Sequence, residues 1–429
     1  MKITVKTNVL KALLDKVSKG ADEQGLQAIS TCVSIEVSKG NLVLRTTNRT
    51  HLLKVTEPKM FGEEVEFYAC VPNQIFWKLI SKMSVPEITL EIGEKTLNVK
   101  GNGDYAIPLS FDVDGTICRI HDIPFEEKED VRNEAGEIVS EKIMEPKSFE
   151  LTSAQMKDIL NYNAASAQRV TSVAGTVIGY YVDKNGFITY DSTACLNNLT
   201  LSDVKAFMPN KMIELCQVFT GEKVKFELLP AIVRVTSGND ELTYKLQDAS
   251  LADNYPVAQI RSLAEREFTG SCKVNKSDLL DALDRLSLFI KIGPTQILAR
   301  LRLIFEKDKL TLFDPYGRNI EVLKTADVAG LESFTQDIDL TYFKSLLSCH
   351  ERDNLQLSYG NDVGIMITDN NIVQLIPYLE EDPSLANPVS NESNDNEDAS
   401  FASIAHSDDD EEAVSLSDIA TEDTDTVEG

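Results

Sequence analysis

The sequence lacks the signatures of several common classes of protein. Its seven cysteines are an odd number without a C-x-x-C pair, which is typical of reduced core residues in a cytosol-like compartment. The four histidines have no metal-like spacing and no G-x-x-x-x-G-K-S/T motif occurs, so neither a zinc site nor an ATPase is expected. No apolar run reaches membrane-spanning length, and the opening MKITVKTNVL has no signal-peptide core. We therefore expect a cytoplasmic protein without cofactor, metal or membrane partner.

Basic residues are missing from the end of the chain. From Glu380 to Gly429 there are seventeen Asp and Glu and no Lys or Arg, which leaves 52 acidic against 42 basic residues elsewhere. Few aromatics and a DDDEE run at 408–412 predict a disordered acidic tail over residues 380–429. Three roles are open for it: solubilising charge, docking of an unknown partner, or occupation of a cleft of the same protein by Val414–Ile419.

One pattern of helices and strands occurs three times before this tail. Strand-turn-strand segments are predicted at Gly40–Val55, Asn185–Leu201 and Asp308–Leu323. Each follows an amphipathic helix, predicted at Thr7–Lys19, Thr152–Ala167 and Asn275–Ile290. A second helix recurs after each of the strings VPN at 71–73, MPN at 208–210 and LTY at 340–342. In the first two strings, the proline is expected to be the first residue of the helix. Units of about 126 residues are domains and not solenoid turns.

Alternating apolar and polar residues dominate the predicted strands, as in VSIEV, LVLRT and ITLEI. Such strands bury one face and leave the other in water, which favours antiparallel sheets backed by helices. We therefore predict an α+β fold and not a doubly wound parallel sheet. The predicted divisions are a first domain over 1–118, a charged linker over 119–147, a second domain over 148–262 and a third over 263–379.

Several strings, in this order, resemble a known family. They are MKITVKTNVLKALLDKVS at the start, VPNQIFWKLISKM in the first unit, TYKLQDASLADNYP near the end of the second unit, and IVQLIPYL at the end of the third. They resemble the bacterial DNA sliding clamp, the beta subunit of the replicative DNA polymerase III holoenzyme, in a divergent form such as a bacterial virus encodes. The resemblance implies three clamp domains per chain and a head-to-tail dimeric ring. Such a homodimer encircles double-stranded DNA without sequence preference, tethers DNA polymerase, depends on a clamp loader and is not an enzyme.

The resemblance also implies that helices line the hole of the ring. Their cations would attract phosphates without reading sequence. The predicted DNA-facing residues are Lys11, Lys16, Lys78, Lys82, Lys157, Lys205, Lys211, Lys276, Arg285, Lys291 and Lys344. The alternative for each is a merely solvated lysine, and Asp278, Asp281 and Asp284 on the same polar face would repel DNA.

A partner cleft is implied between the second and third domains, where the family binds short linear peptides. Carried over by alignment, its walls are Val173, Thr193, Leu196, Pro256, Gln374, Ile376, Pro377, Tyr378 and Leu379. The family usually has Thr-Asp-Gly-His-Arg-Leu where this chain has Tyr190–Leu196, so the His-Arg pair is missing here. The alternative is that these residues are ordinary interface core.

Ring closure would pair the first domain's last strand, Tyr105–Phe111, with the third domain of the other chain. The predicted seam residues are Ile107, Leu109, Leu286, Leu288 and Phe289. Pro108 removes one ladder donor and limits pairing to one side of the strand.

Two other functions are open at this point. The string DVDGT at 112–116 matches the nucleophile loop of haloacid-dehalogenase-type phosphotransferases, so magnesium-dependent phosphohydrolysis through Asp112 is one of them. A scaffold that has the fold but does not encircle DNA is the other, and it would be a monomer.

Overall fold

The structure is a computed structural model. It describes residues 1–25, 27–132, 138–167, 179–246, 251–290, 299–331, 333–361 and 363–380. The predicted tail, apart from Glu380, therefore lies outside the described residues, as do Val173 and Lys291.

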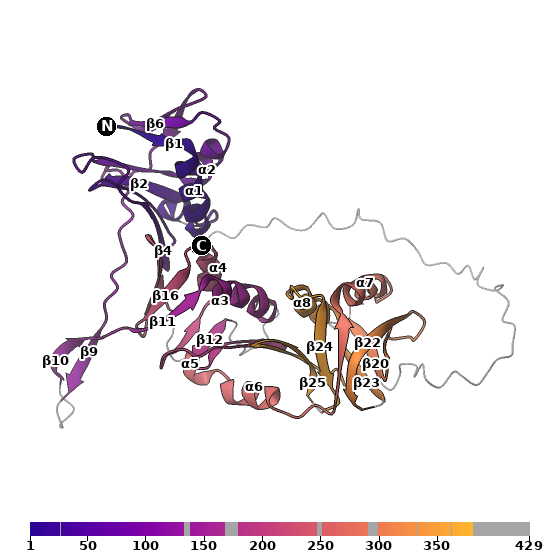
Figure 1. Ribbon diagram of the computed structural model, residues 1–429. Helices are drawn as coiled ribbons and strands as arrows, with labels where there is room; N and C mark the ends of the chain where they lie inside the picture. Colours follow the sequence, from indigo (N-terminus) through magenta and orange to yellow (C-terminus); the bar gives the residue numbers. More distant parts are fainter. Residues whose placement is uncertain are drawn as a thin grey trace, which may run out of the picture. The chain divides into compact units, whose positions relative to one another are not determined.

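One order of elements occurs three times along the described chain: strand, helix, four strands, helix, three strands (Figure 1). The first repeat comprises β1 (Lys2–Lys6), α1 (Thr7–Val17), β2 (Cys32–Ser38), β3 (Asn41–Thr47), β4 (His51–Glu57), β5 (Phe67–Pro72), α2 (Asn73–Ser81), β6 (Glu87–Ile92), β7 (Thr96–Lys100) and β8 (Asp104–Pro108). The second comprises β11 (Lys147–Thr152), α3 (Ser153–Asp158), β12 (Tyr180–Asp183), β13 (Gly186–Asp191), β14 (Thr193–Asn198), β15 (Lys205–Met208), α4 (Asn210–Leu215), β16 (Lys223–Leu228), β17 (Ile232–Ser237) and β18 (Asp240–Lys245). The third comprises β19 (Gly270–Asn275), α7 (Lys276–Ser287), β20 (Arg300–Glu306), β21 (Lys309–Phe313), β22 (Ile320–Gly330), β23 (Ser333–Asp339), α8 (Leu340–Ser348), β24 (Asn354–Tyr359), β25 (Gly364–Asp369) and β26 (Ile372–Pro377).

Further elements stand between the repeats. The segment predicted as a charged linker contains a hairpin of β9 (Lys128–Arg132) and β10 (Ile138–Ile143). Two short helices, α5 (Leu251–Asn254) and α6 (Val257–Ala264), follow the second repeat. The domain boundaries stay a prediction, because the described residues form one compact unit.

The strands of each repeat form two antiparallel groups. In the first repeat these are β1-β6-β7-β8 and β5-β2-β3-β4, and the corresponding strands of the other two repeats pair in the same order. Alternation along strands such as β16, whose burial alternates residue by residue, places one face of each group in the core. The prediction of an α+β fold with antiparallel sheets is confirmed.

Consecutive repeats are joined strand to strand. β18 of the second repeat pairs with β4 of the first, with Leu242 opposite Leu53. β26 of the third repeat pairs with β14 of the second, with Leu196 opposite Val373. In both cases the last strand of a repeat pairs with a strand of the preceding repeat. That partner is the third of the four strands that lie between the two helices of the preceding repeat. Among the described residues, β8 pairs only with β7. β22 pairs with β21 through residues 320–324 and with β19 of its own repeat through residues 325–330, so its first half has no described strand from another repeat beside it.

The helices pack on the sheets through regularly spaced apolar residues. Helix α1 buries Leu10, Leu13, Leu14 and Val17, which is the spacing of one helical face. α1 packs against α2, where the Trp77 indole Nε1 donates a 2.7 Å hydrogen bond to Asp15 Oδ1. In the third repeat, α7 packs against α8 in the same way.

Three predicted helices differ in detail from the structure. Pro72 and Pro209 lie at the N-cap and not at the first helical position of α2 and α4. The helix predicted to run to Ala167 changes after α3 into a π-helical turn, Ile159–Asn163, and then a short 3-10 turn. The cause is long-range, because the buried Asn163 amide donates to the Cys195 carbonyl oxygen (3.2 Å) and holds this turn against β14.

All seven cysteines are free, and six of them are buried. Within the described ranges, no helix combines the length and the apolar character needed to cross a membrane.

Candidate functional site

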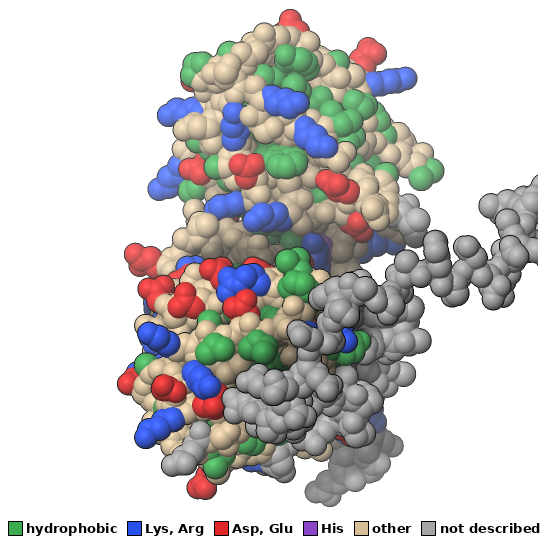
Figure 2. All heavy atoms as spheres, turned by 90° about the vertical axis from the view of Figure 1, so that its right-hand side faces the viewer, with side chains coloured by type: hydrophobic (Ala, Val, Ile, Leu, Met, Phe, Trp, Pro, Cys, Tyr) green, Lys and Arg blue, Asp and Glu red, His purple; other side chains and the backbone are tan. Residues whose placement is uncertain are grey.

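Three of the predicted DNA-facing lysines are exposed and form no ion pair or hydrogen bond with the described residues. Lys78 lies on α2, Lys82 directly follows α2, and Lys211 is the second residue of α4. Figure 2 shows Lys and Arg side chains interspersed with Asp and Glu on the faces of both the first and the third repeat. These three ammonium groups are the ones free to attract an anionic polymer.

Three other predicted lysines are used inside the chain. Lys11 Nζ donates to the Met83 carbonyl oxygen (2.7 Å) and Lys276 Nζ to the His350 carbonyl oxygen (2.5 Å). Lys16 Nζ forms a 2.8 Å ion pair with Asp240, which ties α1 to the start of β18. These lysines are only half exposed, so they hold neighbouring elements together.

The remaining predicted cations each face a carboxylate. Lys157 pairs with Glu351 (2.5 Å), Lys205 with Asp253 (2.5 Å) and Lys344 with Asp284. Arg285 donates two hydrogen bonds to Glu321, at 2.6 and 2.9 Å. Lys205 lies on strand β15 and not on a helix. In the third repeat, Asp284 of α7 therefore neutralises Lys344, and Glu321 of β22 neutralises Arg285.

The predicted cleft residues fall into two groups. Thr193, Leu196, Gln374 and Ile376 are buried, because β14 and β26 are paired into one sheet. Pro256, Pro377, Tyr378 and Leu379 keep exposed surface. The structure thus brings the two predicted walls together, but half of the described residues are interface core and only the other half remain accessible.

An aromatic cluster covers this sheet from the side of α5 and α6. Tyr255 stacks on Tyr181, with ring centroids 5.5 Å apart, and also contacts Phe207. Burial raises the pKa of the Tyr255 hydroxyl. The neighbouring Pro256 is half exposed, so this cluster supports the accessible part of the cleft.

A buried polar network at the junction of the second and third repeats was not predicted. His350 Nε2 lies 2.8 Å from Gln374 Oε1, and His350 Nδ1 lies 3.3 Å from Asp369 Oδ2. Tyr162 donates to the same carboxylate (3.4 Å), and burial together with Asp369 raises the pKa of Tyr162 to about 12. Arg352 pairs with the other Asp369 oxygen at 2.9 Å. The network joins residues up to 212 positions apart, so no local signal could have revealed it.

A second buried histidine marks the junction of the first and second repeats. His51 stacks on Tyr244 of β18, with ring centroids 5.7 Å apart, and its Nε2 lies 2.8 Å from the Gly20 carbonyl oxygen. Burial, and to a smaller degree the charge of Lys211, lowers the pKa of His51 below its ordinary value of 6.5. The folded junction therefore favours the neutral imidazole.

We expect His51 to make stability depend on pH. The unfolded chain binds a proton at this site more readily than the folded chain, so stability is full above pH 6.5 and falls as pH drops below it. His51→Gln should reduce the difference between the free energies of unfolding at pH 7.5 and pH 5.5, measured by urea denaturation. An unchanged difference would show that His51 does not titrate on unfolding.

The residues predicted for the seam between two chains also fall into a buried group and an exposed group. The side chains of Ile107, Leu109 and Leu286 are buried within the chain, whereas Leu288 and Phe289 are exposed. The first half of β22, which pairs with β21 and not with β19, carries two further apolar side chains that were not predicted from the sequence. Ile320 and Val322 are 54% and 57% exposed, on the same face by the two-residue period of a strand.

The DVDGT loop does not have the setting of a phosphotransferase nucleophile. It closes a small turn between Phe111 and Ile117 after the edge strand β8, and not the first strand of a parallel sheet. Asp114 Oδ1 accepts hydrogen bonds from the Thr116 amide (2.9 Å) and hydroxyl (2.7 Å). The Cys118 thiol donates to Asp112 (3.3 Å). Both carboxylates stabilise the turn, and the described residues contain no group of acidic, Cys or His side chains placed to hold a metal ion.

The fold is that of bacterial sliding clamps. The DNA polymerase III beta subunit of Borrelia burgdorferi, solved with a natural product, matches with a TM-score of 0.72 at 17% identity over 88% of this chain and 99% of its own. The DNA polymerase sliding clamp of Bacillus subtilis matches with a TM-score of 0.71 at 17% identity over 89% and 99%. The Helicobacter pylori beta clamp bound to a DNA ligase peptide matches with a TM-score of 0.68 at 17% identity over 88% and 100%. No protein-family model matches the sequence, and no curated protein does. A viral source stays a prediction.

Proposed function

We propose that the protein is a DNA polymerase processivity factor that encircles double-stranded DNA as a dimeric sliding clamp. The observation that carries the proposal is the likeness to bacterial clamps over essentially their whole length, which spans all three repeats and not one shared domain. The proposed role is mechanical and not enzymatic, since a closed ring retains a polymerase on DNA by topology.

The internal junctions support a head-to-tail ring. Within one chain, β18 adds to β4 and β26 adds to β14. By the same rule, β8 of one copy adds to β22 of a second copy, and two such seams close the ring. The exposed side chains of Ile320 and Val322 on β22, together with Leu288 and Phe289, supply the apolar surface that such a seam needs.

The surface charge supports weak and sequence-independent contact with DNA. Lys78, Lys82 and Lys211 are free to face phosphates, whereas the predicted cations Arg285 and Lys344 of the third repeat are paired with carboxylates. Few free cations suit a clamp, because tight phosphate contacts would oppose sliding. A polymerase and a clamp loader are the proposed protein partners.

The cleft is the proposed site for partner peptides. Pro256, Pro377, Tyr378 and Leu379 offer accessible surface beside the junction of β14 and β26. The Helicobacter pylori clamp was solved with a DNA ligase peptide, which gives the class of ligand. The missing His-Arg pair at Tyr190–Leu196 means that the peptide preferred here differs from the family's usual one.

The mass in solution tests this proposal. A chain of 47.6 kDa should sediment at equilibrium as a dimer at micromolar concentration, because two seams dissociate together. The non-encircling scaffold requires a monomer under the same conditions, so a mass of one chain would favour that alternative.

A further inference from the structure

The β9–β10 hairpin stands apart from the large sheets. Its two strands pair only with each other, and every described residue of both is exposed. Val139 and Ile143 on β10 are 59% and 58% exposed. A two-stranded sheet alone is marginally stable in water, and apolar residues gathered on a free strand edge are typical of a surface that pairs with another strand.

The base of the hairpin is fixed to the second repeat. The Met144 amide donates to the Glu127 carbonyl oxygen (2.9 Å), and Glu127 Oε1 accepts from the Ala231 amide (2.8 Å). The Arg234 guanidinium lies 4.3 Å from the centre of the Phe125 ring. The base of the hairpin is therefore held against the turn between β16 and β17, and the two strands extend from it into solvent.

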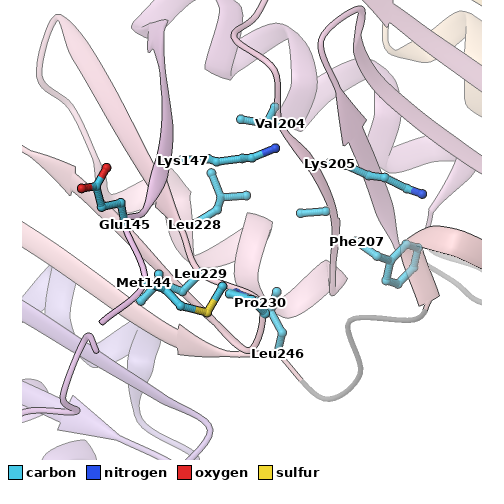
Figure 3. A pocket seen from close by; sticks show the side chains of 11 residues that line it. Met144, Glu145, Lys147, Val204, Lys205, Phe207, Leu228, Leu229, Pro230 and Leu246 are labelled. Carbon is cyan, nitrogen blue, oxygen red and sulfur yellow. The ribbon is translucent and has the colours of Figure 1, made fainter. Parts of the chain in front are cut away.

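The chain leads from β10 directly into a cavity of about 280 Å³. Figure 3 shows Met144 beside Leu229, Pro230 and Leu246 at one end of it. Phe207 of β15 also lines it. Strands β11 and β15, whose first residues Lys147 and Lys205 lie at the cavity, are the outermost strands of their sheets. An apolar hollow thus continues a row of exposed apolar side chains and unpaired strand edges.

The charge of this region is acidic. The hairpin's cations are paired within it, as Lys128 with Glu141 (3.1 Å), Arg132 with Asp130 (3.4 Å) and Lys142 with Glu129 (3.8 Å). Glu126 and Glu145, at the two ends of the hairpin, form no ion pair among the described residues, although the charge of Glu126 acts on the nearby Lys128. A ligand that complements this surface carries positive charge.

We propose that the β9–β10 hairpin and the cavity at its base form a docking site for an extended segment of another protein in which apolar and basic residues alternate. The segment adds its backbone to the free edge of β10. Its apolar side chains cover Val139 and Ile143 and enter the cavity beside Met144, while its basic side chains face Glu126 and Glu145. The site is separate from the ring seam and the peptide cleft, so it does not depend on DNA encirclement.

A fluorescent peptide of four alternating Lys-Val pairs tests the site by anisotropy with the full chain. It should bind at least tenfold more tightly than the block peptide of four Lys followed by four Val, and than the alternating Glu-Val peptide. Amide hydrogen exchange should slow in residues 138–143 when the Lys-Val peptide is bound. Equal binding of the two Lys-Val isomers would overturn the proposal, since only the alternating one matches a strand.

The variant Val139→Asp/Ile143→Asp separates docking from simple charge attraction. Two added carboxylates would strengthen a purely electrostatic contact, whereas docking predicts at least tenfold weaker binding because apolar cover is lost. Ile75→Asp, at an exposed apolar position on α2, should leave the affinity unchanged. Unchanged or tighter binding by the hairpin variant would overturn the proposal.

Discussion

Ile320→Asp combined with Val322→Asp is expected to convert the dimer into a folded monomer. Both side chains are more than half exposed in the single chain, so their replacement should leave the monomer stable. In the ring they would be covered by β8 of the second copy, and burial of each stabilises by about 1.5 kcal/mol. Losing both, and burying unpaired carboxylates instead, should weaken each seam by about 3 kcal/mol or more, which is about a hundredfold.

Sedimentation equilibrium between 0.1 and 10 µM measures this effect. The matched control is Ile75→Asp/Ile138→Asp, which places the same charges at two exposed apolar positions on α2 and β10. The control should remain a dimer, and both variants should keep the thermal transition of the parent. A seam variant that stays dimeric would exclude β22 as the contact strand.

Replacing Lys78, Lys82 and Lys211 together by Gln should weaken binding of a short DNA duplex on the order of a hundredfold at low salt. Each phosphate contact contributes about 0.9 to the slope of log affinity against log salt concentration. The slope should therefore fall by up to about 2.7. Anisotropy titrations from 50 to 200 mM KCl give both quantities.

The control for this variant removes the same charge from paired lysines. In Lys157→Gln/Lys205→Gln/Lys344→Gln each position loses a cation that already faces a carboxylate. The affinity of this control for the duplex should change by a few fold. The slope of its log affinity against log salt concentration should change little. Equal slopes for the two triple variants would mean that the free lysines do not face the phosphates.

The threefold order of elements was predictable because each unit carries its own local signals. Amphipathic spacing such as Leu10, Leu13, Leu14 and Val17, and alternation within strands, depend only on neighbouring residues. The joining of repeats was not predictable in this way. Pairs such as Lys16 with Asp240 and Tyr162 with Asp369 connect residues far apart in sequence.

The contacts of the candidate site residues were also not predictable from the sequence. A lysine on an amphipathic helix looks free in sequence, yet Lys11 and Lys276 bond to backbone carbonyl oxygens. Ile107 and Leu109 are apolar residues of an edge strand, but their own sheet buries them. Val322 of β22 pairs with Thr311 of β21, yet its side chain is exposed. The hairpin β9–β10 was missed because its many charges resemble those of a linker.

Retention on end-blocked DNA tests encirclement most directly. The protein is mixed with a linear duplex carrying biotin at both ends, streptavidin is added to block the ends, and KCl is raised to 1 M to screen charge contacts. A ring that has threaded onto the duplex should stay bound, and blocking the ends before mixing should abolish retention. Release at 1 M KCl in both orders of addition would contradict encirclement and leave a protein that binds DNA only by charge.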